Sequence, residues 1–134
     1  MTLTEEQRRQ LIHLRLENAD QALADAAVLL DAKSLRGASN RCYYAMFYAA
    51  SALAIRDGKA FRKHSGLISY FHAQYMKTQC LPRDLGQMFV NAFDNRSQTD
   101  YQDDLTVSLD DVAGSLEDAK HFVAELKKFL GQAN

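Results

Sequence analysis

The sequence has little of the residue types that interrupt helices. Among its 134 residues there are one proline and six glycines, and tryptophan is absent. A β-sandwich or barrel needs frequent turns, and therefore more proline and glycine, so this composition disfavours an all-β fold. Hydrophobic residues make up 47% of the chain, which excludes a disordered protein and is enough for the core of one domain. We therefore expect a few long helices.

Features typical of disulfides, metal sites and nucleophilic catalysis are also missing. Cys42 and Cys80 are too few for a disulfide framework, and neither has a context that lowers a thiol pKa. A di-iron bundle needs two Glu-x-x-His pairs. His121 has Asp118 three residues before it but His13 has no acidic residue there, so we expect both histidines on solvated helix faces. With no glycine-rich phosphate loop either, the sequence predicts no metal and no cofactor.

The chain lacks a strong charge of either sign. Sixteen Lys and Arg nearly balance seventeen Asp and Glu, for a formal net charge of −1. Such a surface does not attract polyanions in general, although a few well-placed arginines can still contact an RNA phosphate. Residues 1–10 do not resemble a secretion signal, and the uncharged stretch 42–55 is shorter than the roughly 17 to 25 residues that cross a bilayer. We expect a cytoplasmic protein without a membrane partner.

Two segments share one helical pattern, in which apolar residues recur at alternating spacings of four and three. The first follows Thr4 and Gln7, which have the form of a capping box, and contains Ile12, Leu16, Ala19, Leu23, Ala26 and Leu30. The second, near the C-terminus, contains Val112, Leu116, Ala119, Val123, Leu126 and Leu130. Residues 33–37 predict a break after the first helix. The next helix, 38–56, is apolar on every side in its centre, which is typical of the buried middle of a bundle.

Two shorter helices are expected in the centre of the chain. After a connection at residues 57–63, Ser65 is placed to cap a third helix, whose apolar residues are Leu67, Ile68, Phe71, Tyr75 and Met76. Pro82 suits the first turn of a fourth helix that runs toward Arg96, with an inner face of Leu85, Met88, Phe89, Ala92 and Phe93.

The last helix completes the predicted architecture. Residues 98–107 are polar and predict irregular structure, after which Ser108 and Asp111 open a fifth helix that Gly131 closes. No repeat or linker divides the chain. We predict an all-α fold, a five-helix up-and-down bundle that forms a single domain over residues 1–134.

Polar groups gather on the otherwise apolar second helix. Arg41 and Tyr44 lie three residues apart and Tyr48 four further on, so they share one helix face. For Tyr43 and Tyr48 we expect rings that fill the core and hydroxyls that find a buried partner. The guanidinium of Arg41 needs an anion or water. Arg41 and Tyr44 are therefore candidates for ligand binding.

Two motifs accompany this face and together indicate a family. Lys63-His64-Ser65-Gly66 opens the third helix, and Arg96-Ser97-Gln98-Thr99-Asp100-Tyr101 ends the fourth. With the Ala-x-x-Arg-x-Tyr-Tyr-Ala segment at 38–45 before them, they resemble the HEPN domain family. The likeness is to the branch of small stand-alone proteins whose fourth helix ends in Arg-x-x-x-Asp-Tyr, and it extends from about Leu11 to Leu130.

The resemblance implies a helical bundle that pairs as a homodimer. Such proteins are often encoded beside a minimal nucleotidyltransferase in toxin-antitoxin or defence operons. Active members cut single-stranded RNA without a metal, using an arginine and, about five residues later, a histidine. The histidine takes the proton of the ribose hydroxyl, and the arginine pairs with the negative charge that builds up at phosphorus.

This sequence departs from that pattern at the histidine. Arg96 is present, but the histidine position holds Asp100 or Tyr101. An ionised Asp100 would repel a phosphate, and Tyr101, with an ordinary pKa near about 10, is a poor base at neutral pH. His64 is the candidate for the missing imidazole, with Lys63 beside it as a candidate ligand contact. Alternatively, Arg96 and Asp100 form an i, i+4 pair that only finishes the helix.

Three functions are compatible with these residues. The preferred one is a HEPN partner of a minimal nucleotidyltransferase in a toxin-antitoxin or defence module, with a groove at the dimer interface for a nucleotide or phosphate, formed by Arg41, Arg96, Asp100 and Tyr101. The second is a metal-independent endoribonuclease toxin for single-stranded RNA. In a variant of it, the nucleotidyltransferase modifies the hydroxyl of Tyr101. The third is a purely structural helical adaptor.

Overall fold

In the part of the chain that the structure describes, the regular secondary structure is helical. The computed structural model describes residues 2–101 and 107–131, with side chains for 2–96 and 107–131. Its elements are α1 (Glu5–Asp31), α2 (Leu35–Arg56), α3 (His64–Phe71), the π-helical turn η1 (His72–Met76), α4 (Arg83–Tyr101) and α5 (Leu109–Phe129). The predicted all-α, five-helix bundle is confirmed. Within these ranges no helix combines the length and apolar character that crossing a bilayer requires.

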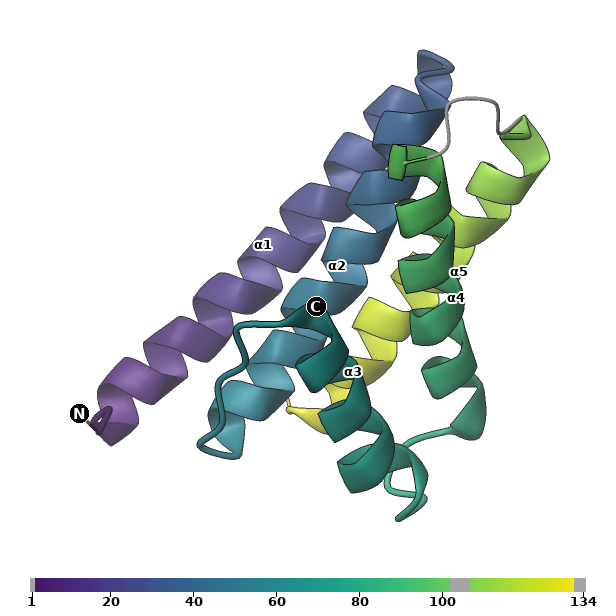
Figure 1. Ribbon diagram of the computed structural model, residues 1–134. Helices are drawn as coiled ribbons and strands as arrows, with labels where there is room; N and C mark the ends of the chain where they lie inside the picture. Colours follow the sequence, from purple (N-terminus) through teal and green to yellow (C-terminus); the bar gives the residue numbers. More distant parts are fainter. Residues whose placement is uncertain (1, 102–106, 132–134) are drawn as a thin grey trace.

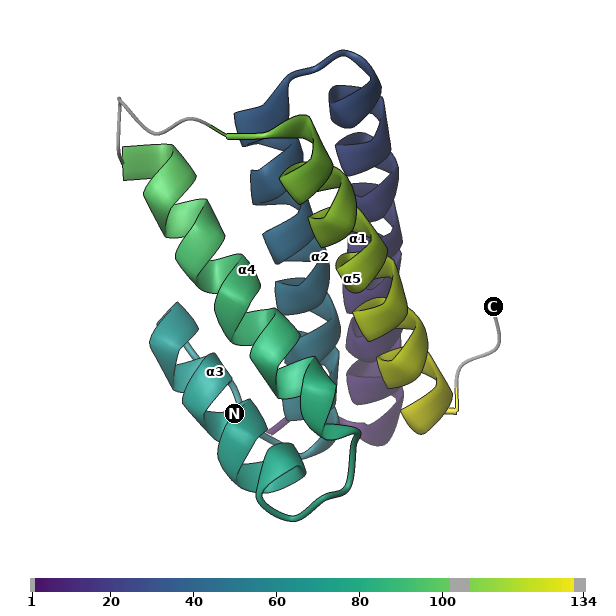
Figure 2. The same ribbon diagram turned by 90° about the vertical axis from the view of Figure 1, so that its right-hand side faces the viewer.

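Helix α2 lies in the middle of the bundle (Figures 1 and 2). It runs antiparallel to α1 along most of its length, while α4 and α5 pack on its other side and the short α3 lies near α4. Each of the other four α-helices contacts α2. This position explains why α2 is apolar on every side in its centre.

Alanines line the pairing of α1 with α2. On α1 they are Ala19, Ala22 and Ala26, and on α2 they are Ala38, Ala45, Ala49 and Ala52, all at most 2% exposed. A side chain that ends at Cβ lets two helices approach closely. The predicted stripe on α1 is thus confirmed, with its larger members Ile12, Leu23 and Leu30 packed at the edge of the core.

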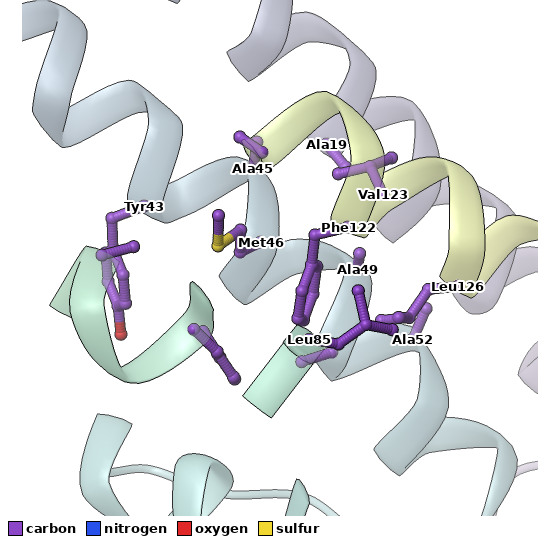
Figure 3. Close-up of a cluster of buried hydrophobic side chains, with 14 of the residues drawn as sticks. Ala19, Tyr43, Ala45, Met46, Ala49, Ala52, Leu85, Phe122, Val123 and Leu126 are labelled. Carbon is purple, nitrogen blue, oxygen red and sulfur yellow. The ribbon is translucent and has the colours of Figure 1, made fainter. Parts of the chain in front are cut away.

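Larger side chains fill the space between α2, α4 and α5 (Figure 3). The ring of Phe122 lies 5.2 Å from Phe89 and 5.5 Å from Phe71, measured between centroids. Leu85, Val123 and Leu126 complete this part of the core. The predicted stripe on α5 is confirmed, and Phe122 adds an aromatic ring to it because it lies next to Val123 on the buried side.

The predicted caps of the first and last helices are present. Thr4 and Gln7 form the reciprocal capping box, with 3.0 Å from the Gln7 backbone amide to the Thr4 hydroxyl and 2.9 Å from the Thr4 backbone amide to the side-chain Oε1 of Gln7. At α5, the Ser108 hydroxyl accepts from the Asp111 amide at 3.0 Å. Gly131 follows the last turn with φ 77°, a conformation that glycine adopts without strain.

Two predicted boundaries are wrong. α2 begins at Leu35 rather than Ala38, because Lys33, at φ 62°, closes a tight turn in which the Ser34 amide donates to the Leu29 carbonyl at 2.8 Å. α3 begins at His64 with Lys63 at its N-cap position, so Ser65 lies within the helix and does not cap it. The motif at 96–101 ends α4 as predicted. Residues 98–101, which were also expected to be irregular, are therefore helical, and residues 102–106 lie outside the described ranges.

The expected third helix is in fact α3 followed by a wider turn. In η1 the Lys77 amide donates to the His72 carbonyl at 2.9 Å, a bond across five residues instead of four. α4 passes close to this turn at Gly86, where an added Cβ would lie 2.8 Å from the Met76 sulfur. A side chain at this position would therefore displace Met76 and His72.

We predict that Ala19→Leu destabilises the protein by about 1 to 3 kcal/mol, because the extra atoms have no room between α1 and α2. Urea unfolding would measure the change. Ala24→Leu, at an exposed position on the same helix, is the control and should shift stability by no more than about 0.5 kcal/mol. Equal effects of the two substitutions would contradict the close packing described here.

Candidate functional site

Three elements bring polar side chains together at one place. α2 contributes Arg41, Tyr43 and Tyr44, α3 contributes His64 at its first residue, and α4 contributes Arg96. We call these five residues the arginine–tyrosine site. Four of them, all but Tyr43, are candidates that the sequence predicted, and they come from three segments far apart in the chain.

Packing of α4 against α2 sets the position of Arg96. The rings of Phe89 and Phe93 lie 6.2 Å and 5.7 Å from the ring of Tyr43. Arg96 follows Phe93 by three residues, so it emerges on the same face of α4 one turn later. The aromatic contacts of α4 therefore direct the guanidinium toward the tyrosines of α2.

Tyr43 links the core to the site. Its side chain is 0% exposed, and its hydroxyl lies 2.8 Å from Nδ1 of His64. The expectation that this ring fills the core while its hydroxyl finds a partner is confirmed, and the partner is a candidate catalytic residue. Burial raises the pKa of Tyr43 well above its ordinary value, so the hydroxyl stays protonated.

His64 is half-buried among aromatic rings. Its ring lies 4.5 Å from Phe47 and stacks at 5.5 Å on Tyr43, measured between centroids. Burial, and secondly the positive charge of Arg96, lower its pKa below the ordinary value. The imidazole is therefore neutral at neutral pH, with one nitrogen that donates and one that accepts.

Two guanidinium groups meet at the ring of Tyr44. Cζ of Arg41 lies 5.0 Å from its centroid and Cζ of Arg96 lies 5.7 Å from it, and the latter is also 5.5 Å from the centroid of Tyr43. These are cation–π distances. Arg41 is held further by Asn40, whose Oδ1 accepts from Nη2 at 2.9 Å and from Nε at 3.3 Å. The arrangement concentrates fixed positive charge beside an aromatic surface.

The structure gives less information on the other residues that were considered for the site. Lys63 is exposed, directly before His64. Asp100 and Tyr101 lie on the last turn of α4, but their side chains fall outside the described part of the chain. The i, i+4 pair between Arg96 and Asp100 and the modification of Tyr101 therefore stay predictions. Tyr48, with its ring 5.9 Å from that of Tyr44, is half-buried.

The histidines considered for a metal lie on helix surfaces. His13 is 2.8 Å from Glu17, and His121 is 3.8 Å from Asp84, measured between Nε2 and a carboxylate oxygen. Across residues 2–101 and 107–131, no group of three or more His, Cys, Asp or Glu side chains gathers as metal ligands would. Cys42 is a core residue whose burial raises its thiol pKa to about 12, which makes it a poor nucleophile.

Sequence reasoning missed the aromatic wall of the site. Phe47 and Phe93 both pack around His64, with ring centroids 4.5 Å and 6.4 Å away. A usable signal existed on α2, because Phe47 follows Tyr43 by four residues and shares its helix face. No comparable signal exists for the contact between His64 and Phe47, which depends on the path of residues 57–63.

Comparison with known proteins places the chain in a family. The family model of the HEPN domain matches residues 12–129. A "UPF0332 protein" of Thermotoga maritima is 31% identical over 124 residues, which cover 92% of this chain and 94% of that protein. Two proteins of Methanocaldococcus jannaschii are each 28% identical. "Putative toxin MJ0605" matches over 91% of this chain and 90% of its own length, and "Putative toxin MJ0142" over 89% and 81%.

We predict that Arg96→Gln raises the pKa of His64 toward its ordinary value of about 6.5, because one of the two causes that lower it is removed. Titration of the imidazole by NMR would measure the pKa. Arg9→Gln serves as the control, since Arg9 is exposed and paired with Glu6 at 2.9 Å on α1. An unchanged His64 titration in Arg96→Gln would show that the guanidinium does not act on the ring.

Proposed function

The chain belongs to the HEPN domain family, and we propose that it acts as a toxin-like HEPN protein together with a minimal nucleotidyltransferase. Two relatives that carry toxin in their names match it over about nine-tenths of its length, which supports a role of this kind. The arginine–tyrosine site binds a phosphate-bearing ligand, a nucleotide or RNA, and lies at the interface of a homodimer.

The observation that carries this proposal is the pair of guanidinium groups at the ring of Tyr44. Guanidinium groups are the side chains best suited to bind a phosphate, because they donate several hydrogen bonds in a fixed plane. A half-buried tyrosine ring beside them offers a surface on which a base can stack. Phosphate and base together make up a nucleotide.

Family membership supports the homodimer and the nucleotidyltransferase as parts of the proposal. A site with two guanidinium groups in one protomer would have four in a symmetric pair, provided that the two-fold axis runs beside α4. Such a concentration of charge suits a polyanion better than a single phosphate. Asp100 and Tyr101, on the last turn of α4, then complete the groove.

We predict that expression of the chain alone slows growth of a bacterial host and that co-expression of the minimal nucleotidyltransferase encoded beside it restores growth and yields a co-purifying complex. Arg96→Ala should abolish the growth defect, because the phosphate contact is lost. Arg83→Ala, an exposed arginine at the opposite end of α4, is the matched control and should remain toxic. A growth defect that persists in Arg96→Ala would contradict the assigned role of the site.

A second function, cleavage of single-stranded RNA without a metal, is favoured by the position of His64. When Nδ1–H donates to the Tyr43 hydroxyl oxygen, Nε2 keeps its lone pair and can take the proton of a ribose hydroxyl. The lowered pKa keeps the imidazole in this basic form at neutral pH. Arg96 would stabilise the negative charge at phosphorus.

We predict that a ribonuclease of this kind cleaves single-stranded RNA in the presence of a chelator and that His64→Ala and Arg96→Ala each reduce the rate by about a hundredfold or more. Gel analysis of end-labelled RNA would measure the rates, with Arg83→Ala as the control. Cleavage that continues in both variants would exclude this chemistry. If the unchanged protein neither inhibits growth nor cleaves RNA, the purely structural adaptor is left as the function.

A further inference from the structure

A pocket lies near the C-terminal end of α2, whereas the arginine–tyrosine site lies nearer the N-terminal end of that helix. It has a volume of about 160 Å³ and is bounded by α1, by the C-terminal half of α2, by residues 59–61 and by the start of α3. Its walls include the apolar side chains Leu11, Ile55, Phe61 and Leu67. The hydroxyl-bearing Ser51 and two cationic residues, Arg15 and Lys59, line it as well.

The charges of this pocket have one sign. No acidic residue lines it, and within the described ranges the side chains of Arg15 and Lys59 make no hydrogen bond or ion pair. Arg8, by contrast, donates from Nη1 to the Ile55 carbonyl at 3.0 Å. Arg15 is half-buried and Lys59 is exposed, and both line the pocket. Such a pocket is complementary to an anion that carries an apolar group.

The connection that forms one wall of the pocket also holds His64. Residues 57–63 lead from the end of α2 to the start of α3 (Figure 1). The connection begins with a turn, in which Gly58 has φ 78° and the Lys59 amide donates to the Ala54 carbonyl at 2.8 Å. Phe61, which lines the pocket, lies three residues before His64 and packs on α3, with its ring 5.1 Å from that of Tyr70.

Both ends of the connection are fixed. The Asp57 carboxylate accepts hydrogen bonds from the hydroxyls of Tyr70 and Tyr75. At the other end, His64 is hydrogen-bonded to Tyr43. A ligand that moves Phe61 therefore acts on α3, whose first residue is His64. The pocket and the arginine–tyrosine site are mechanically linked through this segment.

We propose that this pocket is the docking site for a segment of a partner protein that carries an apolar side chain next to carboxylates, and that docking displaces His64. A protein segment fits better than a small metabolite because apolar side chains extend beyond the pocket. Phe61, on its wall, is 37% exposed, and Leu14, directly before Arg15 on α1, is 46% exposed. The proposal rests on the proposed function only in that a protein partner exists.

A peptide titration followed by NMR tests the proposal on the isotopically labelled full chain. The probe is a seven-residue peptide of alternating glutamate and leucine with blocked ends, and the comparison peptide has lysine in place of glutamate. We expect the glutamate peptide to shift the amide signals of Arg15, Ser51 and residues 59–61, and with them the imidazole signals of His64. Arg15→Gln combined with Lys59→Gln should weaken binding about tenfold or more.

Controls separate this site from the arginine–tyrosine site. Arg9→Gln, on the exposed face of α1, should leave the affinity unchanged, and so should Arg96→Gln. Binding of the two peptides with equal affinity would overturn the proposal, as would shifts confined to Arg41 and Arg96. Phenylacetate that binds as tightly as the glutamate peptide would identify a small-molecule site and overturn docking of a partner. If Arg96→Ala does not abolish the growth defect, the proposed function fails, but the peptide titration still tests the docking site.

Discussion

The enclosure of α2 by the other helices is the constraint from which the rest of the structure follows. Between Ala38 and Ile55 its residues are buried except along one face. The half-buried residues of this face are Asn40, Arg41, Tyr44, Phe47, Tyr48, Ser51 and Ile55. The arginine–tyrosine site lies at the N-terminal end of this face, and the pocket lined by Arg15 and Lys59 lies at its C-terminal end. Polar chemistry on α2 is therefore restricted to one face, and both candidate sites use it.

Burial also determines which charges the site can carry. It raises the pKa of Tyr43 and lowers that of His64, so that both groups favour their neutral forms at neutral pH. Arginine, in contrast, keeps its charge at any pH that a protein experiences. The site thus combines permanent positive charge with neutral hydrogen-bonding neighbours. An anion bound there would meet the same charges over a wide range of pH above the pKa of His64.

Most of the fold could be predicted from local patterns because each helix carries its own signal. The four-three stripes of α1 and α5, the capping box at Thr4 and the apolar centre of α2 depend on residues close in sequence. Boundaries failed where backbone geometry decided them, as at Lys33 with its positive φ. The wider turn η1 leaves no clear trace in the pattern of apolar residues, because Phe71 and Tyr75 keep a helical spacing of four.

The candidate site was predictable only in part. Arg41, Tyr44, His64 and Arg96 were found through the motifs that carry the family resemblance, and the structure brings them together. The bond between Tyr43 and His64 spans 21 residues, and the rings of Phe47 and Phe93 enclose it from two different helices. Such contacts depend on where the connection of residues 57–63 ends, which no local pattern reports. Ser65 was misassigned as a cap for the same reason.

The turn η1 has a consequence for comparing this chain with its relatives. A π turn accommodates one residue more than an α turn, so it can take up an insertion without changing the helix on either side. Within α3, one inserted residue would rotate everything beyond it by about 100° and move Leu67 or Phe71 out of the core. Differences in length between family members in this region should therefore collect at residues 72–76, and alignments that place gaps inside α3 would misassign its buried positions.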